Sequence, residues 1–392
     1  MNRRHLIIGC LAVFSGWAGP PAAMAQDTVK IGLILPMSGP FASTGRQIDA
    51  AVKLYMQQNG STVAGKKIEV LLKDDTGTAD VTKRLAQELI VNDKVAVLAG
   101  FGLTPLAMAT APIATQAKVP EIIMAAGTSS ITEASPFIVR TSFTLAQSAV
   151  PIAEWAAKNG IKKVTTIVSD FAPGHDGEKS FSDAFTKAGG TVENVRAPLR
   201  NPDFAPFLQK AADSKPDAIF VFVPSGVGSL FMKQYRERGL DKSGIKLIGP
   251  GDVTDDDILN DMGDVALGVI TAQFYSAAHD SPENKAYVAA FTKANSGMRP
   301  NFMSVGGYDG MHLIYEALKK TNGSTDGQAL IDAMKGLAWT SPRGPISIDP
   351  ETRDIIQNIY IREVKRVDGQ LYNVEFATIP NVKDPVKAAK KQ

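Results

Sequence analysis

The stretch "VKIGLILPMSGPFASTGRQIDAAVKLYMQQNG", residues 29–60, joins an apolar run to a long segment of helical period. The apolar run ends in a turn rich in Pro, Gly, Ser and Thr, and this turn leads directly into the helical segment. Hydroxyl groups and the unpaired N–H groups of a helix N-terminus converge at such a turn, where they favour an anionic group. We therefore expect a β-strand, a polar loop and an α-helix, with the loop facing something polar.

The alternation of strand and helix continues along the chain in two series. Short β-rich runs recur, and most precede a segment of helical period such as "TADVTKRLAQELIVND" at 78–93. We expect strands at 29–35, 67–74, 95–100 and 120–125 in the first series, and at 164–170, 191–197, 217–224 and 245–250 in the second. This order predicts an α/β protein with two doubly wound parallel-sheet lobes, in which ligands bind at the carboxyl ends of the strands.

The lobes do not divide the chain simply, because no Pro-rich or Gly/Ser-rich linker separates the two series. The segments "FIVRTSFT" (137–144) and "GVITAQFY" (268–275) predict extended, ordered crossings instead. A hairpin with its turn at Asp368-Gly369 is expected near the end of the chain. We therefore expect three crossings, and the predicted parts are a first lobe of residues 27–140 and 275–345, a second lobe of residues 141–274 and 346–380, and a C-terminal tail of residues 381–392.

The first 25 residues have the pattern of an export signal. Arg3 and Arg4 precede the apolar run "LIIGCLAVFSGWAG", and the small residues of "PPAAMA" predict cleavage after Ala25. The mature protein should therefore be exported. Cys10 in "IIGC" resembles a lipoprotein processing site with too little apolar sequence before it, and "NRRHLI" resembles a partial twin-arginine signal, so the export route stays open.

Charge and motifs argue against nucleic acid and against catalysis. Two of the 42 Lys and Arg lie in the leader, so the mature chain has a formal charge near zero and no basic stripe. The phosphate-loop, dinucleotide-loop, nucleophile-elbow and zinc-protease motifs are absent from the sequence. His175, His279 and His312 have no metal-ligand spacing. The acidic run Asp255 to Asp257 favours a helix start over a metal site, so we expect no enzyme, no metal and no cofactor.

Several motifs in order carry a resemblance over nearly the whole mature chain. These are "IGLILPMSGPFASTG", "KDDTGTADVTKRLAQELI", "LAGFGLTPLAMATAPIA", "AAGTSSIT", "SDFAPG", "GPGDVTDD" and "GYDG". Together they resemble the type I periplasmic solute-binding proteins of ATP-driven (ABC) importers, in particular the leucine/isoleucine/valine-binding family. The resemblance implies a two-lobed periplasmic clamp, expected to be monomeric, that closes on a small solute and presents it to an inner-membrane permease driven by an ATPase.

The resemblance implies a carboxylate cradle in the first lobe. The family's carboxylate-binding hydroxyl falls on Thr104, and its backbone-plus-hydroxyl turn falls on Ala126, Gly127 and Thr128. Taken alone, both threonines are more typical of helix or turn caps than of ligand contacts, and the resemblance reverses this preference. The lip of the cleft would run from Ser38 to Thr44. Thr44 departs from the family, which frequently has an aromatic residue there, and Phe41 or Phe101 would compensate.

Residues of the second lobe and of the returning chain would complete the site. They are Phe171 to Gly174 including Pro173, Pro224 with Ser225, Asp252, and Met303 to Gly306. Relatives that bind amino acids place a glutamate for the ammonium group just after a Gly-Pro pair, where this chain has Gly251 followed by Asp252. Two ligand classes therefore stay level: branched-chain or other hydrophobic amino acids, and aromatic or 2-oxo carboxylates without an ammonium group.

One reading from another functional class also stays open. The same clamp fold occurs in ligand-sensing domains that signal to a partner rather than deliver cargo. The expected export of the chain, without a membrane span or effector domain in its sequence, favours transport over sensing.

Overall fold

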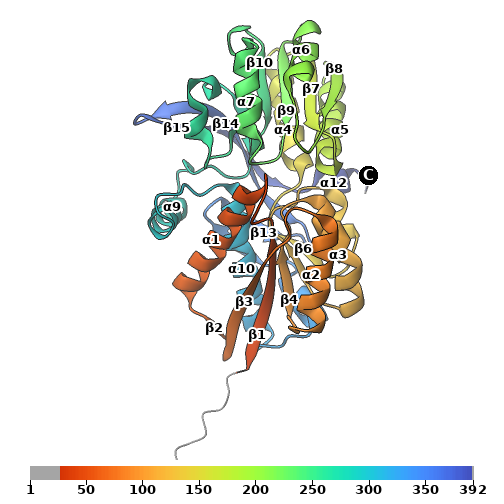
Figure 1. Cartoon of the computed structure of the whole chain (residues 1–392), viewed down its shortest axis with the longest axis vertical. Coiled ribbons are helices and arrows are strands. Elements are labelled where there is room, and N and C mark those ends of the chain that lie inside the picture. The colour runs from red at the N-terminus through yellow and green to blue at the C-terminus, as the bar shows by residue number, and fades with distance from the viewer. Residues whose placement is uncertain (1–26, 391–392) are drawn as a thin grey trace, which may run out of the picture.

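The computed structural model describes residues 27–390, and these form two lobes stacked along the long axis of the molecule (Figure 1). The predicted cleavage site after Ala25 lies outside the described residues. Each lobe has a β-sheet with helices on both faces, as the strand and helix order of the sequence predicts.

The first lobe is built on a six-stranded sheet with the order β2-β3-β1-β4-β5-β6. All neighbours are parallel except the short β2, which is antiparallel to β3. The strands are β1 (Thr28–Leu35), β2 (Thr62–Val63), β3 (Lys66–Asp74), β4 (Val97–Gly100), β5 (Glu121–Ile123) and β6 (Ile138–Arg140). β1 lies at the centre because its apolar residues are buried on both faces, for example Leu33 on one side and Ile34 on the other.

Helices cover both faces of this sheet. Helices α1 (Ala42–Asn59) and α10 (Phe302–Lys320) bury one face, while α2 (Ala79–Val91) and α3 (Thr104–Ala117) bury the other. The remaining elements near this lobe are the 3-10 turn η1 (Ser129–Glu133), α9 (Pro282–Ala294) and α11 (Gly327–Met334). α10 comes from the returning chain, so the first lobe is assembled from two separate parts of the sequence.

The second lobe has a nine-stranded sheet with the order β12-β13-β14-β11-β10-β9-β7-β8, and β15 also pairs with β14. The strands are β7 (Lys163–Ser169), β8 (Thr191–Ala197), β9 (Ala218–Phe222), β10 (Lys246–Pro250), β11 (Ile270–Gln273), β12 (Ala338–Ser341), β13 (Gly344–Ile348), β14 (Ile355–Val367) and β15 (Gln370–Val382). β7 to β11 are parallel, whereas β12 to β15 pair antiparallel. The β14–β15 hairpin turns at Asp368 and Gly369, as predicted.

The helices of the second lobe also lie on both faces of its sheet. α4 (Leu145–Lys158) and α5 (Ala172–Lys187) pack on one face, and α6 (Ala205–Asp213) and α7 (Gly228–Glu237) on the other. The alternation along β9 explains this, because Phe220 enters one core cluster and its neighbours Ile219 and Val221 enter the other. The short elements are η2 (Leu240–Lys242), η3 (Gly251–Thr254), α8 (Leu259–Met262), η4 (Gly263–Ala266) and α12 (Pro385–Ala389).

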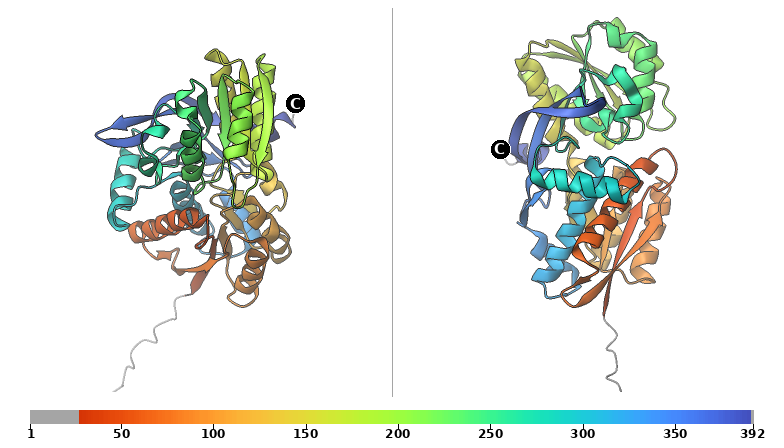
Figure 2. Two further views of the ribbon diagram at one scale, coloured as in Figure 1. Left: turned by 45° about the horizontal axis from the view of Figure 1, so that its top comes forward. Right: turned by 90° about the vertical axis from the view of Figure 1, so that its left-hand side faces the viewer.

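The chain passes between the lobes after β6, after β11 and around β12 to β14, and the right-hand view of Figure 2 shows the blue strands of the last passage at one side of the molecule. β12 and β13 pair into the second sheet, yet Trp339 of β12 donates to Asp309 of the first-lobe helix α10 at 3.0 Å. The predicted boundary at 345/346 therefore falls inside β13, which joins the lobes.

The predicted C-terminal tail contains ordered structure up to residue 390. β15 continues to Val382, and α12 then packs so that Asp384 and Lys387 are buried. Lys387 contacts Thr132 of the first lobe and Asp354 beside the third crossing. The sequence did not reveal this helix because five residues are too few for a helical period to be visible.

Candidate ligand-binding site

A cavity lies between the lobes where the carboxyl ends of both sheets meet. Its free space is about 30 Å³, so the walls that the two lobes contribute lie close together here. The lining residues follow β4, β5 and β6 in the first lobe and β7, β9 and β10 in the second, with Thr44 from α1 and Met303 from α10 added. They are Thr44, Gly102, Leu103, Thr104, Ala125, Ala126, Gly127, Phe143, Leu145, Phe171, Pro173, Phe222, Pro224, Ser225, Asp252 and Met303.

Two threonine hydroxyls mark the first-lobe side of this cavity. Oγ1 of Thr104 and Oγ1 of Thr128 lie 2.8 Å apart in a hydrogen bond, and both side chains are buried. Thr104 begins α3, Pro105 follows in the first turn, and no side chain caps this helix N-terminus. The partial positive charge of the helix end therefore adds to two hydroxyls that can each donate to one anion.

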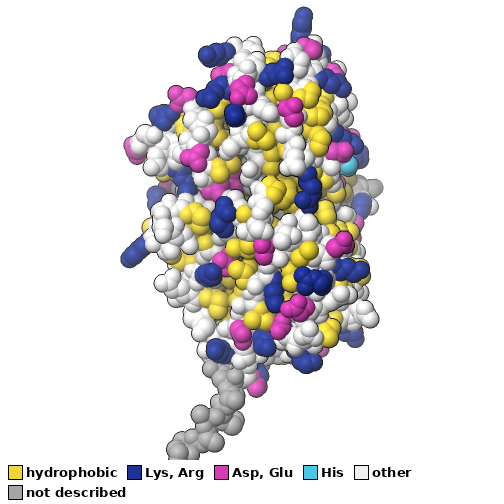
Figure 3. Space-filling view, viewed as in Figure 1, with side chains coloured by type: hydrophobic (Ala, Val, Ile, Leu, Met, Phe, Trp, Pro, Cys, Tyr) yellow, Lys and Arg dark blue, Asp and Glu magenta, His cyan; other side chains and the backbone are white. Residues whose placement is uncertain are grey.

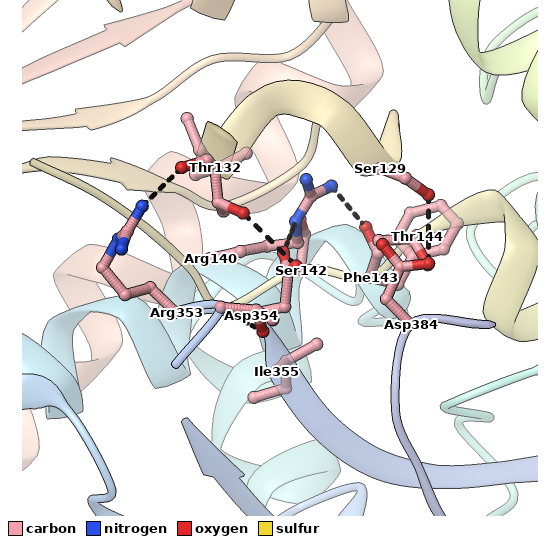
Figure 4. A network of polar contacts seen from close by, with 12 residues as sticks. Ser129, Thr132, Arg140, Ser142, Phe143, Thr144, Arg353, Asp354, Ile355 and Asp384 are labelled. Carbon is pink, nitrogen blue, oxygen red and sulfur yellow. Dashed lines mark hydrogen bonds and ion pairs between the residues drawn. The ribbon is translucent and has the colours of Figure 1, made fainter. Parts of the chain in front are cut away.

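The turn at residues 126–128 is held from behind by Arg140, whose side chain is fully buried (Figure 4). Its guanidinium donates to the carbonyl oxygens of Ala126 at 2.9 Å, Thr128 at 2.6 Å and Phe143 at 2.8 Å. Nε donates to Asp354 at 2.9 Å, which balances the buried charge. Arg140 thus fixes the threonine turn and ties it to the first and third crossings.

The second lobe presents another helix N-terminus to the cavity. α5 begins after Phe171, has Pro173 in its first turn and has no side-chain cap. A Cβ at Gly174 would lie 1.9 Å from the carbonyl oxygen of Ser169, so only glycine permits this tight entry from β7. The Phe171 ring stacks on Phe222 with centroids 6.0 Å apart, and both rings line the cavity.

Asp252 is the one ionisable residue among the described residues that line the cavity. It lies in η3 at the carboxyl end of β10 and is 3 % exposed. Burial raises the pKa of its carboxyl group to about 7, while its own backbone N–H, Arg362 and Gln273 oppose this rise. Nε2 of Gln273 donates to Asp252 over a long 3.4 Å. Asp252 can therefore present either a carboxylate or a neutral acid to a bound molecule near neutral pH.

The structure brings most of the predicted site residues to one cavity. Those in the lining are Thr44, Thr104, Ala126, Gly127, Phe171, Pro173, Ser225, Asp252 and Met303, and Thr128 is bonded to Thr104 just behind it. Ser38 is exposed on the loop before α1 and does not line the cavity. Phe101 packs in the core beneath α2 and α3, and Phe41 packs against second-lobe residues, so neither replaces the missing aromatic at Thr44.

Sequence reasoning missed several apolar lining residues. Phe143 and Leu145 follow β6, and Phe222 ends β9. Their place at the carboxyl ends of predicted parallel strands was the available signal. An apolar residue there is indistinguishable in sequence from a core residue, because only the packing of the second lobe shows which face remains open.

The prediction that Asp255 to Asp257 start a helix is wrong. Asp255 ends the 3-10 turn η3, and the next helix, α8, begins only at Leu259. Asp255 accepts from Asn301 at 2.9 Å, and Asp256 accepts from Asn373 at 3.0 Å. These carboxylates are side-chain partners of other segments rather than helix caps, a role set by tertiary contacts that the local sequence does not contain.

The described histidines each have a neighbour of their own. His175 pairs with Asp170, His279 with Glu375 and His312 with Tyr55. Within residues 27–390, no group of three or more His, Cys, Asp or Glu side chains has a metal-binding arrangement. Among the helices of this range, none has a hydrophobic stretch of the length that a bilayer requires. On the face seen in Figure 3, basic and acidic side chains are interspersed.

Comparison with known proteins agrees with this architecture. The model of the family described as periplasmic binding protein matches residues 28–370. The Leu/Ile/Val-binding protein homolog 6 of Brucella melitensis is 47 % identical over 388 residues, which cover 97 % of this chain and 98 % of the relative.

Two solved solute-binding proteins of ABC transporters have the same fold. The one from Rhodopseudomonas palustris BisB5, in complex with 3,4-dihydroxybenzoic acid, is 69 % identical with a TM-score of 0.91, and the match covers 92 % of this chain and 99 % of that one. The one from R. palustris HaA2, in complex with p-hydroxybenzoic acid, is 45 % identical with a TM-score of 0.90, covering 93 % and 100 %. The chain therefore belongs to the periplasmic binding protein family and is a solute-binding protein of the ABC-transporter class rather than an enzyme.

Proposed function

We propose that this protein captures a hydroxylated benzoate, such as 3,4-dihydroxybenzoate, in the interlobe cavity. The observation that carries the proposal is the composition of the cavity. The neutral hydroxyls of Thr104 and Thr128 form a cradle for a ligand carboxylate, the walls are aromatic, and Asp252 is the single acid among the described lining residues. The 69 % identical protein in complex with 3,4-dihydroxybenzoic acid supports the same ligand class. Of the two classes that the sequence left level, the aromatic carboxylates are therefore favoured.

Each part of such a ligand has a counterpart among the lining residues. The ligand carboxylate would accept from the hydroxyls of Thr104 and Thr128 and face the N-termini of α3 and α5. The ring would lie among Phe143, Phe171 and Phe222, where flat apolar surfaces favour an aromatic group. We propose that the contacts with the ligand come from Thr44, Thr104, Ala126, Gly127, Thr128, Phe171, Pro173, Ser225, Asp252 and Met303.

Asp252 would meet a ring hydroxyl. A phenolic O–H donates to a carboxylate and accepts from a neutral acid, so it suits a side chain with a pKa of about 7. An amino acid would instead bury an ammonium group, which requires a countercharge at all times. The second candidate, a hydrophobic amino acid, follows from the name of the Brucella relative and would need Asp252 as a permanent carboxylate.

Transport is the proposed use of this binding. The leader would be cleaved after Ala25, and the monomeric mature protein would bind its solute in the periplasm. Rotation of the two lobes about the three crossings would close the cavity, and the closed form would deliver the solute to an inner-membrane permease and its ATPase. The alternative, a sensing clamp that signals to a partner, uses the same closure. A permease and ATPase encoded beside this chain would favour transport.

Calorimetric titration tests the ligand class directly. We expect tight binding of 3,4-dihydroxybenzoate and 4-hydroxybenzoate, weaker binding of benzoate and no binding of leucine. Asp252→Asn should bind the hydroxybenzoates about as well as the unsubstituted protein at neutral pH, because it removes a negative charge near an anionic ligand. If leucine bound tightly and Asp252→Asn abolished that binding, the amino-acid candidate would replace the aromatic one.

A further inference from the structure

A second set of polar contacts joins the lobes away from the ligand cavity. Oγ of Ser43 donates to Oδ2 of Asp257 at 2.5 Å, and Nε2 of Gln47 lies 3.4 Å from the same oxygen. Ser43 and Gln47 belong to the first turns of the first-lobe helix α1, whereas Asp257 follows β10 and η3 of the second lobe. None of the three lines the ligand cavity, and Ser43 and Asp257 instead line a separate groove at the lobe junction.

Two further contacts bring the same surfaces together. Asn301, which caps α10 of the first lobe, donates to Asp255 at 2.9 Å. Gly226 of the second lobe has a positive φ of 93°, and a Cβ there would lie 2.7 Å from the carbonyl oxygen of Pro40 in the first lobe. The two backbones therefore touch directly beside Asp257, so any opening of the lobes must separate Ser43 from Asp257.

Gln47 is positioned for this contact before the lobes meet. Its Nε2 also donates to the carbonyl oxygen of Arg299 at 2.9 Å, and its side chain is fully buried. Ser43 lies one helical turn earlier on the same face of α1, which presents both donors toward one carboxylate. A carboxylate that accepts from two prepared donors forms a stronger contact than a pair of neutral groups.

We propose that Ser43, Gln47 and Asp257 form an interlobe latch that sets how long the closed protein retains its ligand. The latch residues themselves do not contact the ligand. The contact exists only when the lobes meet, so its free energy adds to the closed state alone. A ligand buried between the lobes leaves only after they part. The latch therefore slows dissociation by the same factor for every ligand, whereas a cavity residue discriminates between ligands.

The test measures the affinity and the dissociation rate of two ligands. The choice of these ligands rests on the proposed function. We expect Ser43→Ala and Asp257→Asn to weaken binding of 3,4-dihydroxybenzoate and 4-hydroxybenzoate about 10-fold or more, since a hydrogen bond to a charged group is lost. Both ligands should lose the same factor through faster dissociation in stopped-flow measurements.

The matched control is Asp261→Asn. Asp261 is exposed, lies four residues after Asp257 in the same groove, and its side chain has no hydrogen bond to the first lobe among the described residues. This variant removes the same charge and should bind both ligands normally. Unchanged affinity in both latch variants, or a loss that differs between the two ligands, would overturn the proposal.

A ligand-independent measurement separates failure of the latch from failure of the proposed function. The sequence has a single cysteine, Cys10, in the predicted leader, so Lys83→Cys on α2 and Lys233→Cys on α7 allow specific fluorophore labelling of the mature protein. Without ligand, Asp257→Asn should shift the distribution of distances between the two fluorophores toward larger separations. If neither hydroxybenzoate bound the unsubstituted protein, the proposed function would fall, and an unshifted distribution would still overturn the latch.

Discussion

Replacing Thr104 by valine removes one hydroxyl from the proposed carboxylate cradle and keeps the shape of the side chain. This hydroxyl is bonded to Thr128 at 2.8 Å, and the side chain is only 3 % exposed. With a carboxylate bound, both hydroxyls can turn toward it. The variant then loses one charge-assisted hydrogen bond, about 1.5–3 kcal/mol, which corresponds to about 10- to 150-fold weaker binding.

The assay is calorimetric titration with 3,4-dihydroxybenzoate, accompanied by thermal unfolding of the ligand-free protein. Thr110→Val is the matched control, because Thr110 lies on the same helix, is fully buried and donates to Glu121 at 2.8 Å instead of lining the cavity. We expect Thr110→Val to lower stability and leave affinity unchanged. We expect Thr104→Val to lower affinity and leave stability unchanged. Normal binding by Thr104→Val would refute the cradle.

The double variant adds a check on geometry. Thr104 and Thr128 share a hydrogen bond, so their effects on affinity should not be additive, and a double-mutant cycle should give a coupling of about 0.5–3 kcal/mol. Additive effects would mean that the two hydroxyls act on separate groups of the ligand.

Four further outcomes follow from the same structure. Because burial raises the pKa of Asp252 to about 7, an anionic ligand should bind more weakly as the pH rises through about 7, and calorimetry of Asp252→Asn should show this dependence removed. Burial also raises the pKa of Glu121 to about 8, so the folded state holds a proton that the unfolded state releases, and the free energy of unfolding should fall as the pH rises from about 4 to 8; denaturant titrations of Glu121→Gln should show a flatter profile. Arg140→Lys keeps the charge but cannot reach all four of its acceptors, so unfolding in denaturant should show a loss of about 3 kcal/mol together with weaker ligand binding. Saturating 3,4-dihydroxybenzoate should reduce the radius of gyration in solution scattering by closing rigid lobes, and identical profiles would contradict the clamp.

The elements of the fold were largely readable from the sequence because their signals are local. Every predicted strand of the two series is present, from β1 to β10, and the Asp368-Gly369 turn joins β14 to β15 as expected. The antiparallel β12–β13 pair was not predicted, because strands of four and five residues are too short to show a clear alternating pattern in the sequence. α12 was missed for the same lack of local signal.

The residues of the candidate site likewise differ in whether the local sequence predicts them. Thr104, Gly127 and Pro173 could be placed from motif spacing, because a strand end followed by a helix start fixes where a loop residue lies. Arg140 could not, because its four acceptors come from the turn after β5, the first crossing and the third crossing, and only the folded chain brings them together.

The strand and helix order, the two-lobed α/β architecture and the resemblance to solute-binding proteins could all be inferred from the sequence, since periodicity, turn residues and motif spacing act over short distances along the chain. Three properties required the folded chain: which apolar residues remain on the cavity wall, the contact of Asp257 with Ser43 across the lobes, and the shift that burial causes in the pKa of Asp252. These properties depend on exclusion of water and on distances between residues far apart in sequence, which no local pattern encodes.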